Sequence, residues 1–129
     1  MNKQVYDATL CRTVTTEQTA KAMGSGSLAV LATPALVALM EECACKALEG
    51  FLEEGQTSVG TALTLRHTAA TPVGMEVRVK AEVSQIDGRR IVFTITAEDE
   101  KGEIGNCTHE RFLVMAERFT EKTYQKLEG

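Results

Sequence analysis

The sequence predicts an α+β fold in which an antiparallel sheet covers one long and mostly buried helix. Three observations support this fold class: an apolar segment with helical start and stop signals at residues 28–55, four strand-like segments after it, and turn-forming residues between those segments. The 129 residues and the 43% of hydrophobic residues are typical of one ordinary domain with a sizeable core. We therefore expect a single domain that spans residues 1–129.

The predicted helix begins at Thr33-Pro34, because threonine is a good N-cap and proline is favoured as the first helical residue. Gly55 is its expected C-terminal stop, with Gly50 as an earlier alternative. Most of the helix surface is apolar, which predicts that the helix is largely buried. Its charged stripe consists of Glu42, Lys46, Glu49 and Glu53.

The segments after the helix are expected to form four antiparallel strands. Residues 75–86 alternate almost perfectly between apolar and polar side chains, as a strand with one buried face does. The breaks between segments contain proline, glycine and aspartate, which favour turns. The expected strands lie at residues 57–71, 75–86, 89–99 and 105–119, and residues 5–14 are expected to add one more.

Composition excludes several classes of protein. The formal net charge of −4 argues against a binder of nucleic acid or of an anionic membrane surface. The chain has neither a run of about 20 apolar residues nor an N-terminal signal peptide, so we expect a cytoplasmic protein. Cys43 and Cys45 would direct their sulfurs about 200° apart on a helix, and no histidine lies at zinc-ligand spacing. We expect four reduced thiols and no metal.

Two titratable residues lie on faces that should be apolar. Glu41 shares a helical stripe with Val37 and Leu48, and a buried carboxylate is costly unless it is paired, neutralised or exposed to a cavity. His67 shares a strand face with Leu63 and other apolar residues. The less specific alternatives are a wet boundary position for the glutamate and a satisfied core position for the histidine.

Arg111 and Thr33 could also contribute to a site. His109 and Arg111 share one face of the last strand, where the arginine could be a solvated charge, a salt-bridge partner or an anion clamp. Thr33 is explained by its role as N-cap, yet its hydroxyl would also lie beside the free N–H groups of the helix N-terminus, which bind developing oxyanions. Spacing alone does not show that these groups meet.

Four segments of the chain resemble the fluoroacetyl-CoA thioesterase family. They are residues 32–41, residues 58–62, the string H-T-A-A-T-P-V-G at residues 67–74 and the string T-H-E-R at residues 108–111. The similarity extends from about residue 28 to residue 126, and the string at residues 67–74 is its most specific part.

The resemblance implies a hotdog fold, a homodimer with active sites at the dimer interface, and acyl-CoA thioesterase activity; pairing of dimers into tetramers stays open. The catalytic residues of the family correspond to Thr33, Glu41 and His67, and two residues that line its acyl pocket correspond to Gly60 and Arg111. By this resemblance the glutamate is general base or nucleophile, the threonine positions it or the acyl group, and the histidine orients the carbonyl or water and transfers a proton. Coenzyme A is part of the substrate, and no other cofactor is implied.

One departure from the family concerns the acyl group. The fluoroacetyl-specific member has phenylalanines that form a lid before the catalytic threonine, whereas residues 24–28 here read Gly-Ser-Gly-Ser-Leu. The departure argues against selectivity for fluoroacetyl-CoA, and a short or medium acyl-CoA is the expected substrate. Residues 23–27 are small and flexible, so a mobile loop is expected there, with a functional lid as the alternative. The alternatives are a non-catalytic module that binds CoA esters and an enoyl-CoA hydratase-like enzyme. A hydratase would usually carry an aspartate and histidine pair near a short loop, which the sequence lacks.

Overall fold

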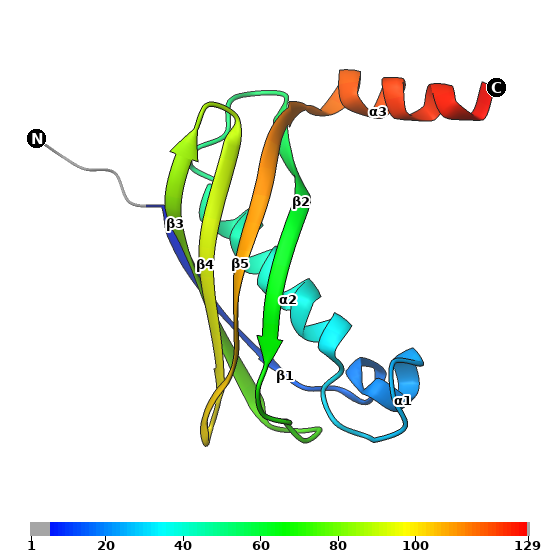
Figure 1. Ribbon diagram of the computed structural model, residues 1–129, viewed down its shortest axis with the longest axis vertical. Helices are drawn as coiled ribbons and strands as arrows, with labels where there is room; N and C mark the ends of the chain where they lie inside the picture. The colour runs from blue at the N-terminus through cyan, green and yellow to red at the C-terminus, as the bar shows by residue number, and fades with distance from the viewer. Residues whose placement is uncertain (1–5, 129) are drawn as a thin grey trace, which may run out of the picture.

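A computed structural model describes residues 6–128 of the chain (Figure 1). It contains five strands, three α-helices and two short 3₁₀ helices. In chain order these are β1 (Asp7–Thr13), η1 (Thr16–Gln18), α1 (Ala20–Met23), α2 (Thr33–Leu48), β2 (Gln56–His67), β3 (Glu76–Asp87), β4 (Arg90–Asp99), β5 (Gly102–Met115), α3 (Ala116–Tyr124) and η2 (Gln125–Glu128).

The five strands form one antiparallel sheet in the order β1-β3-β4-β5-β2, so β1 and β2 are its edges. Helix α2 lies across one face of this sheet, and α1 packs near the end of the sheet where α2 begins (Figure 1). Helix α3 follows β5 and projects away from the opposite end. The α+β class with a sheet around one central helix is therefore confirmed.

The core lies between α2 and the inner face of the sheet. Alternation along the strands turns every second side chain toward α2, which explains why most apolar residues of β3 and β4 are buried. From the helix, the same core receives a broad apolar face. Its fully buried members include Leu36, Met40, Cys43, Ala44, Val77, Val79, Ala81, Ile91, Phe93 and Ile95.

The predicted N-cap of the central helix and its predicted stop at Gly55 were wrong, whereas the alternative stop at Gly50 lies directly after the C-cap residue Glu49. Ala32, with extended backbone angles, is the N-cap, and Thr33 is the first helical residue with no side-chain capping bond. Helix α2 ends at Leu48 rather than at Gly55, because the chain turns there and packs Phe51 against the core. Gly55, at φ +81°, instead belongs to the turn that precedes β2.

Two helices lie where a loop or a strand was expected. The last strand was expected to extend to residue 119 but ends at Met115, and α3 begins at Ala116, where good helix formers replace the alternating pattern. Helix α1 includes Met23, the first residue of the loop expected at residues 23–27. The strand expected at residues 5–14 corresponds to β1, and its first residue, Val5, lies outside the described part of the chain.

The strand predicted at residues 57–71 is shorter in the structure, where β2 ends at His67. Thr71 is buried beyond the strand and donates its hydroxyl to Asp99 at 2.9 Å. All four cysteines are free thiols. Within residues 6–128, no helix is both long enough and apolar enough to cross a bilayer.

Candidate active site

The first polar cluster joins the start of α2 to the end of β2. Thr33 Oγ1 lies 2.8 Å from His67 Nδ1. The threonine is exposed and the histidine is half-buried. The threonine hydroxyl therefore hydrogen-bonds to the histidine ring and does not cap the helix, whose N-cap is Ala32.

The other nitrogen of His67 is left without a partner. Nε2 is buried and makes no hydrogen bond to any described residue. Burial lowers the pKa of His67 from its usual value of 6.5, against the opposing effect of a backbone hydrogen bond at Ala69. The ring is therefore neutral at pH 7, and its Nε2 is available to a group that the single chain does not supply.

A cavity of about 290 Å³ opens beside this pair. Its walls come from α1, from the loop before α2 and from the segment after β2. Small side chains dominate, and no aromatic ring takes part except the imidazole of His67. The lining residues are Ala20, Ser25, Val30, Leu31, Thr33, His67, Thr68, Ala69 and Ala70.

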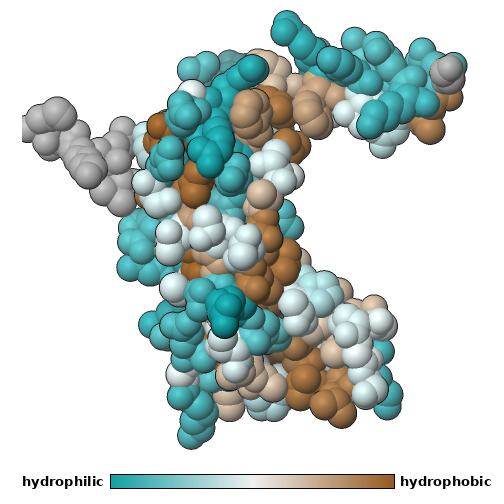
Figure 2. Space-filling model, in the orientation of Figure 1, coloured by the Kyte–Doolittle hydropathy of each residue, from teal (hydrophilic) through white to brown (hydrophobic). Residues whose placement is uncertain are grey.

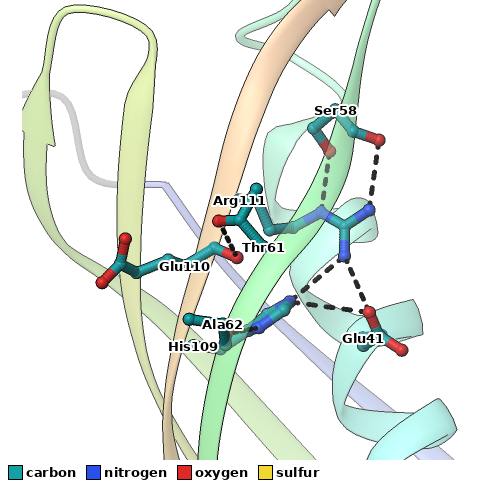
Figure 3. Close-up of polar contacts among 7 residues, drawn as sticks. All are labelled: Glu41, Ser58, Thr61, Ala62, His109, Glu110 and Arg111. Atoms are coloured by element: carbon teal, nitrogen blue, oxygen red, sulfur yellow. Dashed lines mark hydrogen bonds and ion pairs between the residues drawn. The ribbon is translucent and has the colours of Figure 1, made fainter.

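The second polar cluster is organised around Arg111 of β5 (Figure 3). Its guanidinium donates from Nε to Ser58 Oγ at 2.8 Å and from Nη2 to the Ser58 carbonyl at 3.1 Å. The remaining nitrogen, Nη1, lies 3.4 Å from Glu41 Oε2 and 3.1 Å from His109 Nε2. The arginine is buried, whereas the Glu41 side chain is 42% exposed. One face of the carboxylate is thus fixed by a cation and the other remains open.

His109 is buried beneath this ion pair, with 1% of its surface exposed. Its Nδ1 lies 2.8 Å from the Ala62 carbonyl, which can only accept, so Nδ1 carries the proton. Nε2 then accepts from Arg111, and the ring is neutral. Burial is the main cause that lowers the pKa of His109, and the charge of Arg111 acts in the same direction. The 4.0 Å approach of Nε2 to Glu41 is therefore not an ion pair.

Gly60 of β2 is the point at which this cluster comes closest to the backbone. A Cβ at this position would lie 2.6 Å from Glu41 Oε2 and 3.3 Å from Arg111 Nη1. A Cβ contact under 3.0 Å requires a neighbour to move. Only glycine leaves the carboxylate in its observed place.

A bulge in β2 lies next to Gly60. Gly60 pairs with Arg111 and Ala62 pairs with Glu110, so Thr61 is an extra residue without a partner of its own. Two side chains stabilise the bulge, since His109 donates to the Ala62 carbonyl and the Thr61 hydroxyl donates to the Glu110 carbonyl at 3.3 Å. Bulges commonly redirect side chains beside functional sites.

The sequence-predicted residues therefore form two groups within the chain. Thr33 lies with His67, and Glu41 lies with Gly60 and Arg111. Among the described residues, no hydrogen bond or ion pair links the groups, and the eight positions from Thr33 to Glu41 correspond to about 12 Å along a helix.

Two residues of the Arg111 cluster were not predicted as site residues. His109 could have been predicted as a site residue because it lies two positions before Arg111 and so shares its strand face. No feature of the sequence marks Ser58 as a site residue. In the part of the chain that the structure describes, no group of three His, Cys, Asp or Glu side chains could hold a metal ion.

Comparison with known proteins gives one family. A family described as fluoroacetyl-CoA-specific thioesterase matches residues 14–117. A fluoroacetyl-CoA thioesterase of Streptantibioticus cattleyicolor is 44% identical over 97 residues, which make up 75% of this chain and 70% of that protein. The family match at residues 14–117 includes all the residues of both polar clusters.

Solved structures agree with this result. A mutant of the fluoroacetyl-CoA-specific thioesterase, in complex with fluoroacetate and CoA, is similar with a TM-score of 0.83 and 36% identity over 88% of this chain and 95% of that chain. A hot-dog-like protein from Thermanaerovibrio acidaminovorans has a TM-score of 0.87 at 23% identity, over 95% of this chain and 91% of that one. At that identity the second likeness shows the fold alone. The hotdog fold expected from the resemblance is confirmed.

Proposed function

Since this chain belongs to the fluoroacetyl-CoA-specific thioesterase family, we propose that it hydrolyses an acyl-CoA thioester to a free acid and CoA. The observation that carries the proposal is the Glu41 carboxylate, which is held on one side by Arg111 at 3.4 Å and is open on the other. Thioester hydrolysis needs an oxygen nucleophile at the carbonyl carbon. The carboxylate supplies it either by direct attack or by taking a proton from an attacking water.

The Thr33–His67 pair supplies the polar contacts to the substrate in this proposal. When Thr33 donates to Nδ1, Nε2 of His67 carries the proton and can donate it to the thioester oxygen as negative charge develops there. Neutrality of the ring, which follows from its lowered pKa, suits this role. The free N–H groups at the start of α2 lie beside Thr33 and favour the same charge.

The cavity beside His67 supports a short or medium acyl group as substrate. Its volume of about 290 Å³ accommodates more than two carbons, and residues 24–28 bring no aromatic side chain to it. A pocket without an aromatic lid selects weakly against acyl groups that are longer than acetyl. The fluoroacetyl preference in the names of the relatives is therefore not part of the proposal.

We further propose that two copies of the chain complete the site. Edge strand β2 is 12 residues long, and one of its sides has no partner strand in the sheet. Unpaired edges are commonly covered by another chain. Apolar surface gathers on the side of the molecule where β2 lies, between the ends that carry α1 and α3 (Figure 2).

An antiparallel pairing of β2 with its copy would bring the two groups together. With Thr61 left out of the ladder as the bulge residue and a twofold axis at Thr64, Gly60 lies opposite His67 of the partner subunit. Glu41, which contacts Gly60, would then face the Thr33–His67 pair of the other copy across the interface. This arrangement gives each dimer two sites, and residues 1–129 act as one domain in each subunit. Four free cysteines support a cytoplasmic location, where thiols stay reduced.

The test measures hydrolysis of acyl-CoAs from acetyl and fluoroacetyl to long-chain and aromatic esters. We expect turnover of a short or medium ester, a fall of about 10³-fold in Glu41→Ala and of about 10²-fold in His67→Ala. Binding of the CoA ester should persist in Glu41→Ala. Absence of turnover on every ester, with binding intact, would favour a non-catalytic binding module instead.

Co-expression of Glu41→Ala with His67→Ala tests the shared site. A mixed dimer holds one site with both substitutions and one site with neither, so random mixing should restore about a quarter of the wild-type activity. If each chain held its whole site, the mixture would be no more active than the better single variant.

A further inference from the structure

The buried ring of His109 occupies a position between the backbone of β2 and the guanidinium of Arg111 (Figure 3). Both ring nitrogens are engaged: Nδ1 donates to the Ala62 carbonyl, and Nε2 accepts from Arg111 Nη1. The ring also stacks on Phe93 of β4, with centroids 6.1 Å apart and planes inclined at 30°. These contacts fix the position, the plane and the tautomer of the imidazole.

Arg111 is held by contacts that leave one nitrogen for the carboxylate. Ser58 accepts from Nε and Nη2, which sets the long axis of the guanidinium. Nη1 is shared between His109 and Glu41 at 3.1 and 3.4 Å. A planar guanidinium with three fixed nitrogens cannot rotate away from the carboxylate without breaking a bond to Ser58 or His109.

We propose that His109 is a positioning residue for thioester hydrolysis, in which its Nε2 lone pair holds Arg111 and thereby fixes the orientation of the Glu41 carboxylate. The inference rests on the proposed function and names a further residue of the same site. His109 touches neither substrate nor reacting atoms in this account. Its effect passes through Arg111, and a carboxylate displaced by about 1 Å is expected to cost roughly 10²-fold in rate.

The bulge in β2 places the Ala62 carbonyl beside position 109, and this explains why a histidine rather than another polar residue occupies that position. The ring must donate to a carbonyl of β2 and accept from a cation of β5, at opposite edges of one rigid group. The neutral Nδ1–H tautomer does both. Asparagine can reproduce only the donor to the Ala62 carbonyl. Glutamine has a longer side chain and can reproduce the acceptor that Arg111 contacts.

The experiment compares His109→Asn with His109→Gln in the full-length protein. The amide of asparagine replaces Nδ1 and loses the contact with Arg111, whereas the amide oxygen of glutamine replaces Nε2 and retains it. We expect kcat to fall about tenfold to a hundredfold in His109→Asn with KM changed by less than about threefold, and to be largely restored in His109→Gln. Thermal unfolding measured on both variants separates this effect from loss of folded protein.

Equal kcat in His109→Asn and the wild type would overturn the inference while leaving the proposed function intact. So would an equal fall of kcat in both variants that follows their melting temperatures, since that pattern indicates a structural role. A wild type without hydrolysis on any acyl-CoA would overturn the proposed function and the inference together. A fall confined to His109→Asn supports both.

Discussion

The two histidines of the chain lie on neighbouring strands and differ in how completely they are bonded. His109 is 1% exposed, and both of its nitrogens have partners in the same chain. His67 has a partner for Nδ1 alone, and its buried Nε2 has none among the described residues. Because buried polar atoms are rarely left unpaired, Nε2 of His67 is available to a group outside the described residues, a role that the proposed function gives to the substrate. The fully bonded ring of His109 therefore suits a residue that positions its neighbours, and the partly bonded ring of His67 suits a residue that contacts the substrate.

The largest expected effect comes from filling the space that Gly60 leaves. In Gly60→Ala the new methyl would lie 2.6 Å from Glu41 Oε2, so the carboxylate must swing away from Arg111. We expect hydrolysis to fall about 10²-fold. Because the end of a glutamate side chain is flexible, the free energy of unfolding should fall by less than about 1 kcal/mol.

Gly50→Ala is the matched control for this change. A Cβ at Gly50 would meet no atom within 4 Å, so activity should stay at the wild-type level. Steady-state kinetics and denaturant unfolding of both variants make the comparison. Wild-type activity in Gly60→Ala would show that the close approach does not position the carboxylate.

A smaller effect on hydrolysis is expected from a change in the Thr33–His67 pair. Thr33→Val removes the hydroxyl that contacts His67 Nδ1 but keeps the shape of the side chain. Hydrolysis should fall about tenfold, and Thr33→Ser should retain most of the activity. Because Thr33 is exposed, the melting temperature should change little. A loss in Thr33→Ser as large as that in Thr33→Val would contradict a role for the hydroxyl.

The smallest expected effect concerns stability as a function of pH. Burial lowers the pKa of His67 and of His109 below 6.5 in the folded protein. Below pH 6.5 the unfolded chain therefore binds more protons than the folded one, and the free energy of unfolding falls as the pH falls. Well above pH 6.5, from about pH 7.5, both histidines are neutral in both states, and this dependence disappears.

The two lowered pKa values share one main cause, which is burial. A backbone hydrogen bond opposes the shift at each histidine, from Ala62 for His109 and from Ala69 for His67, and at His109 the charge of Arg111 lowers the pKa further while Glu41 and Glu110 oppose it. Denaturant unfolding between pH 7.5 and 5.5 should show a slope that both His109→Gln and His67→Gln reduce. Glu110, with a pKa lowered by Arg90 below 4.5, titrates outside this interval. An unchanged slope in both variants would contradict the assignment.

Periodicity predicted the architecture well because the fold follows from simple alternation. β3 and β4 lie within about one residue of their predicted limits, since each has one buried face and clear turns at its ends. The limits of α2 were predicted poorly. Threonine before proline is compatible with both the N-cap and the first helical position, and the choice depends on a tertiary contact with His67.

The site was less accessible from sequence than the fold. The residue pattern singled out Glu41, His67, Thr33 and Arg111, and the resemblance added Gly60 and the catalytic roles. How these residues group in space followed from neither. Ser58 meets Arg111 only because β2 and β5 pair in one register, and His109 meets Ala62 only because that register shifts at Thr61. No local propensity specifies where a bulge occurs in a strand.

The extra residue in β2 also determines how this strand can change in length. Gly60 and His67 are separated by an odd interval in the sequence, which strict alternation would place on opposite faces, whereas their partners Arg111 and Gly105 on β5 are separated by an even one. Thr61 corrects the parity. Deleting Thr61 would leave an even interval that opposes the even interval on β5, so a single gap at the bulge should keep the imidazole turned toward α2. A single gap elsewhere between Gly60 and His67 that leaves the bulge in place would turn the imidazole to the outside, even where single substitutions are harmless.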